Sequence, residues 1–119
     1  MRNAVSFLVV DDNSTMRRVI GRLVGEFADE IIECEDGKQA LLAYARHQPE
    51  WVLMDVQMPE KDGLTATREI CAAYPKAKVV IVSNYGDEAT RAAANQAGAV
   101  AYVLKENLLE LRDLFAVKL

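Results

Sequence analysis

Cysteine is scarce in this sequence, and long apolar runs are absent. Only Cys34 and Cys71 occur among 119 residues. Two thiols in a chain of this length do not form a disulfide framework, so we expect both to be reduced and buried as small hydrophobic residues. No apolar run approaches the ~20 residues of a membrane span. The first residues, Met1–Val5, lack the long apolar segment of a secretory signal. We therefore expect a cytoplasmic protein with no membrane partner.

The sequence also lacks an excess of positive charge. It has 14 Lys and Arg against 18 Asp and Glu, for a net charge of −4. Direct nucleic-acid binding depends on clustered Lys and Arg, so this balance argues against it. We interpret the adjacent Arg17 and Arg18 as a solvated helix face. There is no glycine-rich phosphate-binding loop either.

What the sequence does contain is the composition of one globular domain. Hydrophobic residues make up 51% and charged residues 27%, enough for a real core. Four short apolar runs are typical of strands buried on both faces of a parallel sheet. They are Val5–Val10, Trp51–Met54, Val79–Val82 and Val100–Leu104. A fifth run, Glu30–Cys34, alternates more and predicts an edge strand.

Helical patterns separate these runs. Apolar residues recur at helical spacing after each run. Capping residues mark the helix starts at Asn13 or Ser14, Asp36, Gly86 or Asp87, and Asn107, while Pro75 stops the third helix and Gly98 the fourth. Strands that alternate with helices predict an α/β fold with a parallel sheet and right-handed crossovers. The fourth helix is rich in alanine, so it has little apolar surface to bury and suits a mobile element.

Polar residues follow the central strands. Asp11 and Asp12 end the first, Asp55 the third, Ser83 the fourth and Lys105 the fifth. Ligands of open α/β sheets bind outside the carboxyl ends of the strands. We therefore expect three carboxylates, a hydroxyl and an ammonium to converge on one crevice.

That combination suits phosphoryl chemistry with a hard cation. Three close carboxylates repel one another, and Mg²⁺, which prefers oxygen ligands, relieves the repulsion. Zinc does not fit, because neither cysteine nor His47 falls near these strand ends. A carboxylate can act as nucleophile and form an acyl phosphate, with a lysine and a hydroxyl stabilising the phosphoryl oxygens.

With these residues in view, the sequence resembles the receiver (response regulator) domain family over essentially its whole length. Four segments carry the resemblance in order, each at a strand end: Val9–Asn13, Met54–Pro59 with Asp62 and Gly63, Ile81–Ser83, and Tyr102–Lys105. The resemblance implies a flavodoxin-like (βα)5 fold. Its five-stranded parallel sheet has the order 2-1-3-4-5 and helices on both faces.

The resemblance also implies roles at the acidic end of the sheet. Asp55 matches the phosphoacceptor. Asp12 and Asp55 match the side chains that bind Mg²⁺, with Asp11 acting through water and the backbone carbonyl of Gln57 as a further ligand. We interpret Gly63 as an ordinary loop residue.

Three further residues match positions that contact the phosphoryl group or respond to it, and two of them, Ser83 and Tyr102, match the family's switch. Ser83 and Lys105 correspond to the pair that contacts the phosphoryl group. Tyr102 corresponds to the aromatic residue that turns inward when the hydroxyl of Ser83 moves toward the phosphate. The face formed by the fourth helix, fifth strand and fifth helix is expected to change with phosphorylation.

The expected partners follow from the same resemblance. The phosphoryl donor would be a histidine kinase or a histidine phosphotransfer protein. The output would be an unidentified protein or a DNA-binding domain, with a phosphorylation-dependent dimer as a further state. We expect residues 1–119 to form a single receiver domain, either whole or the N-terminal part of a longer regulator. It would be a signalling protein rather than an enzyme, although it takes part in its own phosphorylation and dephosphorylation.

Two positions depart from the family pattern. Glu106 follows Lys105, where many receivers have a proline after a cis peptide bond, so we expect a trans bond here. Asn84 stands where a small residue is common. We expect Asn84 and Tyr85 to narrow the approach to the phosphoryl group and slow its hydrolysis.

Three alternatives remain beside this reading. A Mg²⁺-dependent phosphatase or phosphotransferase would need an aspartate two residues after the nucleophile, and this chain has Gln57 there. A degenerate receiver-like interaction module would lack Asp55 or Lys105. A flavodoxin-like cofactor protein would want donors, not acids, in the first loop.

Overall fold

Strands and helices alternate along the whole of the described chain. The computed structural model describes residues 5–118. The strands are β1 (Ser6–Val10), β2 (Glu30–Cys34), β3 (Trp51–Met54), β4 (Val79–Ser83) and β5 (Ala101–Leu104). The helices are α1 (Ser14–Val24), α2 (Gly37–His47), α3 (Gly63–Ala73), α4 (Glu88–Ala97), the short 3-10 helix η1 (Lys105–Asn107) and α5 (Glu110–Lys118).

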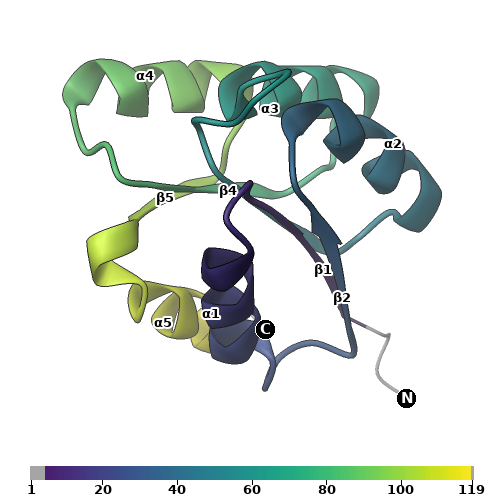
Figure 1. The fold of residues 1–119 in the computed structure, drawn as a ribbon, viewed down its shortest axis with the longest axis vertical. Coiled ribbons are helices and arrows are strands. Elements are labelled where there is room, and N and C mark those ends of the chain that lie inside the picture. Colours follow the sequence, from purple (N-terminus) through teal and green to yellow (C-terminus); the bar gives the residue numbers. More distant parts are fainter. Residues whose placement is uncertain (1–4, 119) are drawn as a thin grey trace.

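The five strands form one parallel sheet in the order β2-β1-β3-β4-β5. Helices α2, α3 and α4 cover one face, and α1 and α5 cover the other (Figure 1). Val10 of β1 lies beside Met54 of β3 in the register of the sheet. The residues that follow these two, Asp11 and Asp55, therefore leave the sheet side by side. The expected fold class and strand order are confirmed.

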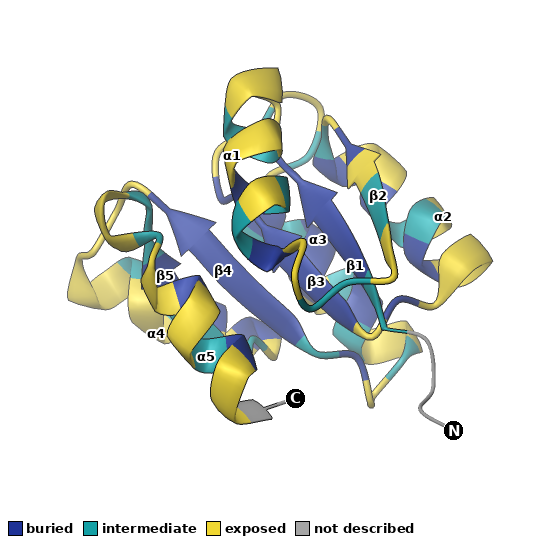
Figure 2. Cartoon of the chain, turned by 90° about the horizontal axis from the view of Figure 1, so that it is seen from below, coloured by how far each residue is buried: buried dark blue, intermediate teal, exposed yellow. Residues whose placement is uncertain are grey.

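The sheet separates two apolar cores, because successive residues of a strand point to opposite faces. Leu8 and Val10 face the core under α2, α3 and α4, whereas Phe7 and Val9 face the core under α1 and α5. Phe115 of α5 packs edge-on against Phe7, with ring centroids 4.9 Å apart. Burying one such side chain stabilises the fold by about 1.5–3 kcal/mol. The central strands are buried along their length (Figure 2).

Four helices begin at a side-chain cap, which satisfies a free backbone N–H of the first turn. The capping residues are Asn13, Asp36, Asp62 and Asp87, and each accepts a hydrogen bond from the backbone N–H three residues later. The prediction that Asn107 caps α5 is wrong. The chain first makes the 3-10 turn η1, and α5 begins at Glu110.

The two cysteines differ in how far they are buried. Cys34 is buried and free, as expected, but Cys71 is only half-buried, because it lies at the edge of α3 with its Sγ 3.7 Å from the carbonyl of Gly98.

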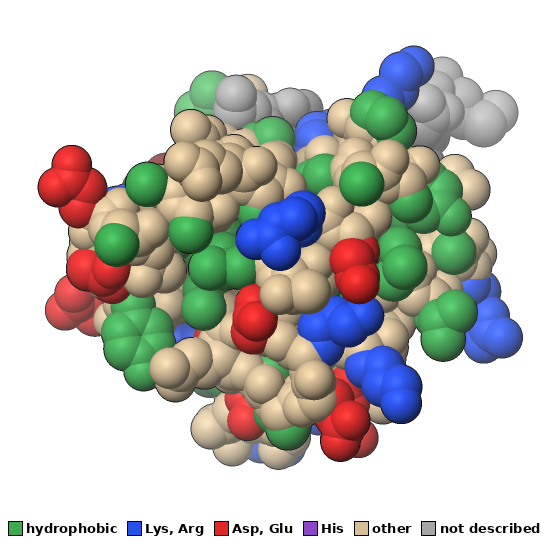
Figure 3. Space-filling view, turned by 90° about the horizontal axis from the view of Figure 1, so that it is seen from above, with side chains coloured by type: hydrophobic (Ala, Val, Ile, Leu, Met, Phe, Trp, Pro, Cys, Tyr) green, Lys and Arg blue, Asp and Glu red, His purple; other side chains and the backbone are tan. Residues whose placement is uncertain are grey.

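Among residues 5–118, no helix is long and apolar enough to cross a membrane. On the face over α2, α3 and α4, basic and acidic side chains are interspersed and form no single basic patch (Figure 3).

Candidate functional site

Three carboxylates meet at the carboxyl edge of the sheet. Asp11 follows β1 and Asp55 follows β3, and their side chains are buried, whereas Asp12 is exposed. One oxygen from each of the three lies within 4.8 Å of the others. The strand-end argument thus predicted correctly which acids converge, although they are up to 44 residues apart in sequence.

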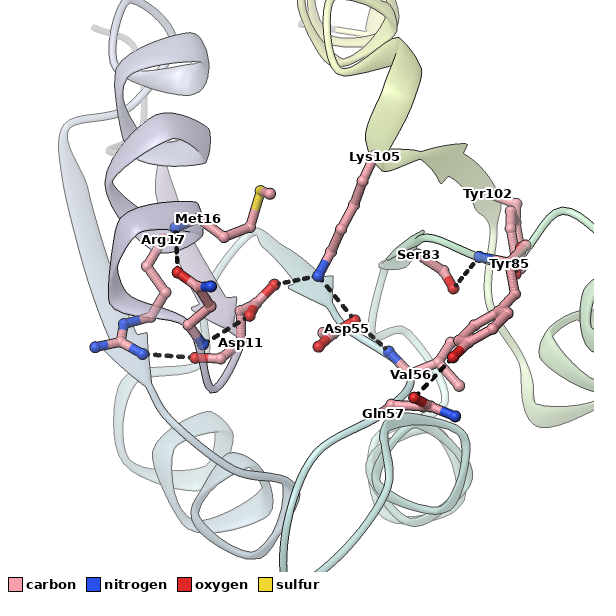
Figure 4. A network of polar contacts seen from close by, with 11 residues as sticks. Asp11, Met16, Arg17, Asp55, Val56, Gln57, Ser83, Tyr85, Tyr102 and Lys105 are labelled. Atoms are coloured by element: carbon pink, nitrogen blue, oxygen red, sulfur yellow. Dashed lines mark hydrogen bonds and ion pairs between the residues drawn. The ribbon is translucent and has the colours of Figure 1, made fainter.

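Lys105 reaches this cluster from the end of β5. Its Nζ lies 2.9 Å from Oδ2 of Asp11 and 3.2 Å from Oδ1 of Asp55 (Figure 4). Burial lowers the pKa of Lys105, but hydrogen bonding and attraction from Asp11 and Asp55 outweigh burial, so its pKa is raised. The ammonium therefore stays charged and holds the two buried carboxylates together.

The Asp55 carboxyl is nevertheless hard to ionise. Burial and the nearby charge of Asp11 raise its pKa to about 6, against the opposing effects of Lys105 and of the Val56 N–H. That N–H donates to Oδ1 of Asp55 at 2.9 Å. In the metal-free protein the three-carboxylate cluster is thus an electrostatic cost that a cation would relieve.

This cost predicts a pH-dependent effect of Asp55→Asn. The folded state favours the protonated form of Asp55. The stability that this preference contributes is complete below the ordinary pKa of 3.8 and is lost as the pH rises through about 6. Asparagine does not ionise. We therefore compare the free energy of unfolding of the variant with that of wild type in EDTA. The variant's advantage over wild type should be ~2 kcal/mol larger at pH 7.5 than at pH 4. Urea titrations at both pH values measure this, and equal differences at the two would contradict it.

The donor set fits a hard divalent cation. All the side-chain ligand atoms in the cluster are carboxylate oxygens, which suit Mg²⁺. Oδ2 of Asp11 is buried, and its contact among residues 5–118 is the ion pair with Lys105 at 2.9 Å. Asp12 makes no hydrogen bond or ion pair with the described residues. Asp12 thus has oxygens available to a metal, whereas at Oδ2 of Asp11 a cation would compete with Lys105.

Ser83 and Tyr102, the two expected switch residues, are joined through Tyr85. Ser83 is fully buried at the end of β4, and its Oγ accepts the backbone N–H of Tyr85 at 3.0 Å. The hydroxyl of Tyr102 donates to the carbonyl of Tyr85. The guanidinium of Arg91 lies over the Tyr102 ring at 4.6 Å from its centroid. The ring of Tyr102 is thus held against the β4–α4 loop (Figure 4).

The same Tyr85 reaches across the crevice. Its hydroxyl donates to Oε1 of Gln57 at 2.8 Å, which links the β4–α4 loop to the loop after β3. Asn84, its neighbour, is exposed and makes no polar contact of this kind with the described residues. Of the two residues expected to narrow the approach, Tyr85 is the one that makes such a contact among residues 5–118.

Gly63 was misread as an ordinary loop residue. It is buried, and its N–H donates to the carbonyl of Val56 at 2.7 Å. A Cβ at this position would lie 1.7 Å from the backbone oxygen of Asp55. The glycine therefore lets α3 begin directly against the backbone of Asp55. The signal in the sequence is the Asp62–Gly63 pair, which carries part of the family resemblance but does not show that the glycine lies against Asp55.

Arg17 was also misread. Its side chain is only 15% exposed, and it turns inward to donate from Nη1 to the backbone carbonyl of Asp11 at 2.6 Å (Figure 4). Its neighbour Arg18 is exposed, as expected.

The peptide bond after Lys105 is trans, as expected, and residues 5–118 contain no cis peptide bond.

Known proteins share both this sequence pattern and this fold. Residues 7–116 match the family model of the response regulator receiver domain. The chain is 37% identical to the chemotaxis protein CheY of Bacillus subtilis over 99 residues, 82% of each protein. It is 32% identical over 107 residues to the transcriptional regulatory protein DegU of Brevibacillus brevis, covering 87% of this chain and 45% of DegU. Its fold matches that of CheY in a CheX-CheY-BeF3-Mg complex from Borrelia burgdorferi, with a TM-score of 0.88, 24% identity and coverage of 97% and 90% of the two chains.

Proposed function

Because the chain belongs to the response regulator receiver domain family and is a phosphorylation-activated switch of two-component signalling, we propose that Asp55 is its phosphoryl acceptor. One observation carries the assignment. Asp55 is a buried carboxylate placed between two further acids and an ammonium. A carboxylate so placed has its nucleophilic oxygen beside both a cation site and a fixed positive charge.

The residues around Asp55 would bind the metal and contact the phosphoryl group. Asp12 and Asp55, with Asp11 and the backbone carbonyl of Gln57, would hold Mg²⁺, which when bound supplies positive charge to the transferring phosphoryl oxygens. Lys105 already contacts Asp55 and can turn its N–H groups to a phosphoryl oxygen. The hydroxyl of Ser83 is the remaining donor at the end of β4.

Tyr85 would then transmit the effect of phosphorylation at Asp55 to Tyr102. A new acceptor at Asp55 draws the Ser83 hydroxyl, whose oxygen also holds the Tyr85 N–H. Movement there reaches Tyr102, which binds the carbonyl of Tyr85. Helix α4 buries only Ala94 and Ala97, so shifting it disturbs little apolar packing. The α4–β5–α5 face is the surface on which we place the output.

The partners follow from this chemistry. The donor would be a phosphohistidine on a kinase or a phosphotransfer protein, and the output a separate protein or an attached regulatory domain. The chain covers 45% of DegU, so the activity of that whole protein is not carried over to this chain. A phosphatase or phosphotransferase is disfavoured, because the amide of Gln57 cannot transfer a proton as the missing aspartate would.

Labelling with a small phosphodonor tests the acceptor. Wild-type protein incubated with Mg²⁺ and acetyl phosphate should gain the mass of one phosphoryl group, and Asp55→Asn should gain none. Asp113→Asn, which removes an exposed acid on α5, is the matched control and should label like wild type. Labelling of Asp55→Asn at the wild-type rate would remove the assignment.

The contact across the crevice predicts the lifetime of the phosphorylated state. Tyr85→Phe removes only the hydroxyl that binds Gln57. A hydrogen bond is worth ~1 kcal/mol, so hydrolysis should become about fivefold faster if this contact restricts the approach of water. Asn84→Ala is the control and should leave the rate unchanged. Decay of the phosphorylated mass after donor removal measures both, and equal rates in all three proteins would contradict the prediction.

A further inference from the structure

Asp12 differs from the other two acids in how it is positioned. Oδ1 of Asp11 accepts the N–H of Asn13 at 2.9 Å, and Oδ1 of Asp55 accepts the N–H of Val56 at 2.9 Å. Lys105 contacts both of these side chains. The exposed Asp12 side chain has no such partner within residues 5–118. The backbone alone therefore decides where its carboxylate lies.

Arg17 holds that backbone. The carbonyl of Asp11 belongs to the peptide that joins Asp11 to Asp12, and Nη1 of Arg17 donates to this carbonyl at 2.6 Å. The bond is charge-assisted and short, which makes it one of the stronger kinds of hydrogen bond. On the other side, the N–H of Asp11 donates to the carbonyl of Cys34 in β2. The backbone of Asp11 is thus held at both its N–H and its carbonyl, directly before Asp12.

Glu33 fixes Arg17 in turn. Nε of Arg17 donates to Oε1 of Glu33 on β2 at 2.9 Å. The Arg17 side chain is 15% exposed and that of Glu33 55% exposed, so the guanidinium has little room for another arrangement. The planar fork lets one group serve both acceptors at once, as an ammonium on a lysine stem cannot do in the same geometry.

We propose that Arg17, anchored by Glu33, is a positioning residue that sets the affinity of the Asp11–Asp12–Asp55 cluster for Mg²⁺ by fixing the peptide between Asp11 and Asp12. The inference rests on the proposed metal site. It concerns a residue that contacts neither the metal nor the phosphoryl group and acts through the orientation of Asp12. Partners that orient metal ligands commonly contribute 10–100-fold to metal affinity.

Electrostatics alone predicts the opposite sign. Arg17 is a positive charge beside an acidic cluster, and its removal should by Coulomb's law make Mg²⁺ bind more tightly. Positioning requires that its removal make Mg²⁺ bind less tightly. The sign of the change in affinity therefore distinguishes the two effects.

The test compares four variants with the wild-type chain. Arg17→Met removes the charge and both hydrogen bonds, and Arg17→Lys keeps the charge but not the fork. Glu33→Ala frees the guanidinium, and Arg18→Met removes the same charge from the exposed neighbour. Titration calorimetry of the metal-free proteins gives the Mg²⁺ dissociation constant. The NMR order parameter of the Asp12 amide, measured without metal, reports the order of the held peptide directly.

We expect Arg17→Met to raise the dissociation constant roughly tenfold and to lower the order parameter of the Asp12 amide. Arg17→Lys and Glu33→Ala should fall between it and wild type, and Arg18→Met should match wild type. Unchanged or tighter binding by Arg17→Met would overturn the inference, and so would equal losses in the Arg17 and Arg18 variants. If Arg17→Met does not fold, unchanged Mg²⁺ binding and an unchanged Asp12 order parameter in Glu33→Ala would overturn it. Wild-type protein that binds no Mg²⁺ would instead refute the proposed metal site.

Discussion

Gly63→Ala should cost the protein ~3 kcal/mol of its free energy of unfolding, the upper end of what overpacking usually costs. The added Cβ would lie 1.7 Å from the backbone oxygen of Asp55 and 2.7 Å from its carbonyl carbon. No rotamer change relieves such a contact, because both partners are backbone. Either α3 or the strand end that carries Asp55 has to move. We expect phosphoryl acceptance to fall with stability, since the displaced atoms belong to the acceptor.

A second glycine provides the control. A Cβ at Gly21, inside α1, meets only the Cδ1 of Ile31, at an ordinary distance of 3.8 Å. Gly21→Ala should therefore stabilise the protein by up to ~1 kcal/mol, because alanine favours the helix and glycine does not. Urea unfolding in EDTA measures both variants. Equal effects of the two substitutions would show that the contact with Asp55 relaxes without cost.

The sequence predicted those site residues whose place depends on the sheet. Asp11 and Asp55 directly follow buried apolar strands, and neighbouring parallel strands bring their carboxyl ends together in any fold of this class. Lys105 was found in the same way. The register that pairs Val10 with Met54 needs no knowledge of loops. The strand bounds were predicted to within one residue at each end, and the capping residues of α1, α2 and α4 were among those predicted.

The residues that were interpreted wrongly make contacts with segments distant in sequence, which local sequence patterns do not encode. Gly63 matters because a helix starts against the backbone of Asp55, and Arg17 because a guanidinium on α1 reaches both a strand end and Glu33 on β2. The contact between Tyr85 and Gln57 joins loops 28 residues apart. Asn107 was read as a cap because a capping residue before an apolar run looks the same whether or not a 3-10 turn intervenes.

Lys105→Met should separate metal binding from phosphoryl transfer. The ammonium is the positive group that contacts both Asp11 and Asp55, so its loss leaves their buried charges unpaired. In EDTA at pH 7.5 the variant should lose ~3 kcal/mol of free energy of unfolding, as when one partner of a buried pair is removed. Mg²⁺ should bind more tightly, because it no longer competes with Lys105 for the same oxygens. Labelling by acetyl phosphate should nevertheless slow roughly 100-fold, because a fixed donor to the phosphoryl oxygens is gone.

The opposite signs make this result hard to obtain by general damage to the fold. A variant that simply disorders the carboxyl edge of the sheet would lose both Mg²⁺ affinity and labelling. Lys78→Met is the matched control, since Lys78 pairs with Glu50 at 2.8 Å where both side chains are more than one-third exposed. It should change stability by less than ~1 kcal/mol and leave metal binding and labelling unchanged. If Lys105→Met binds Mg²⁺ more tightly and still labels at the wild-type rate, Lys105 holds the acids together but does not contact the phosphoryl group.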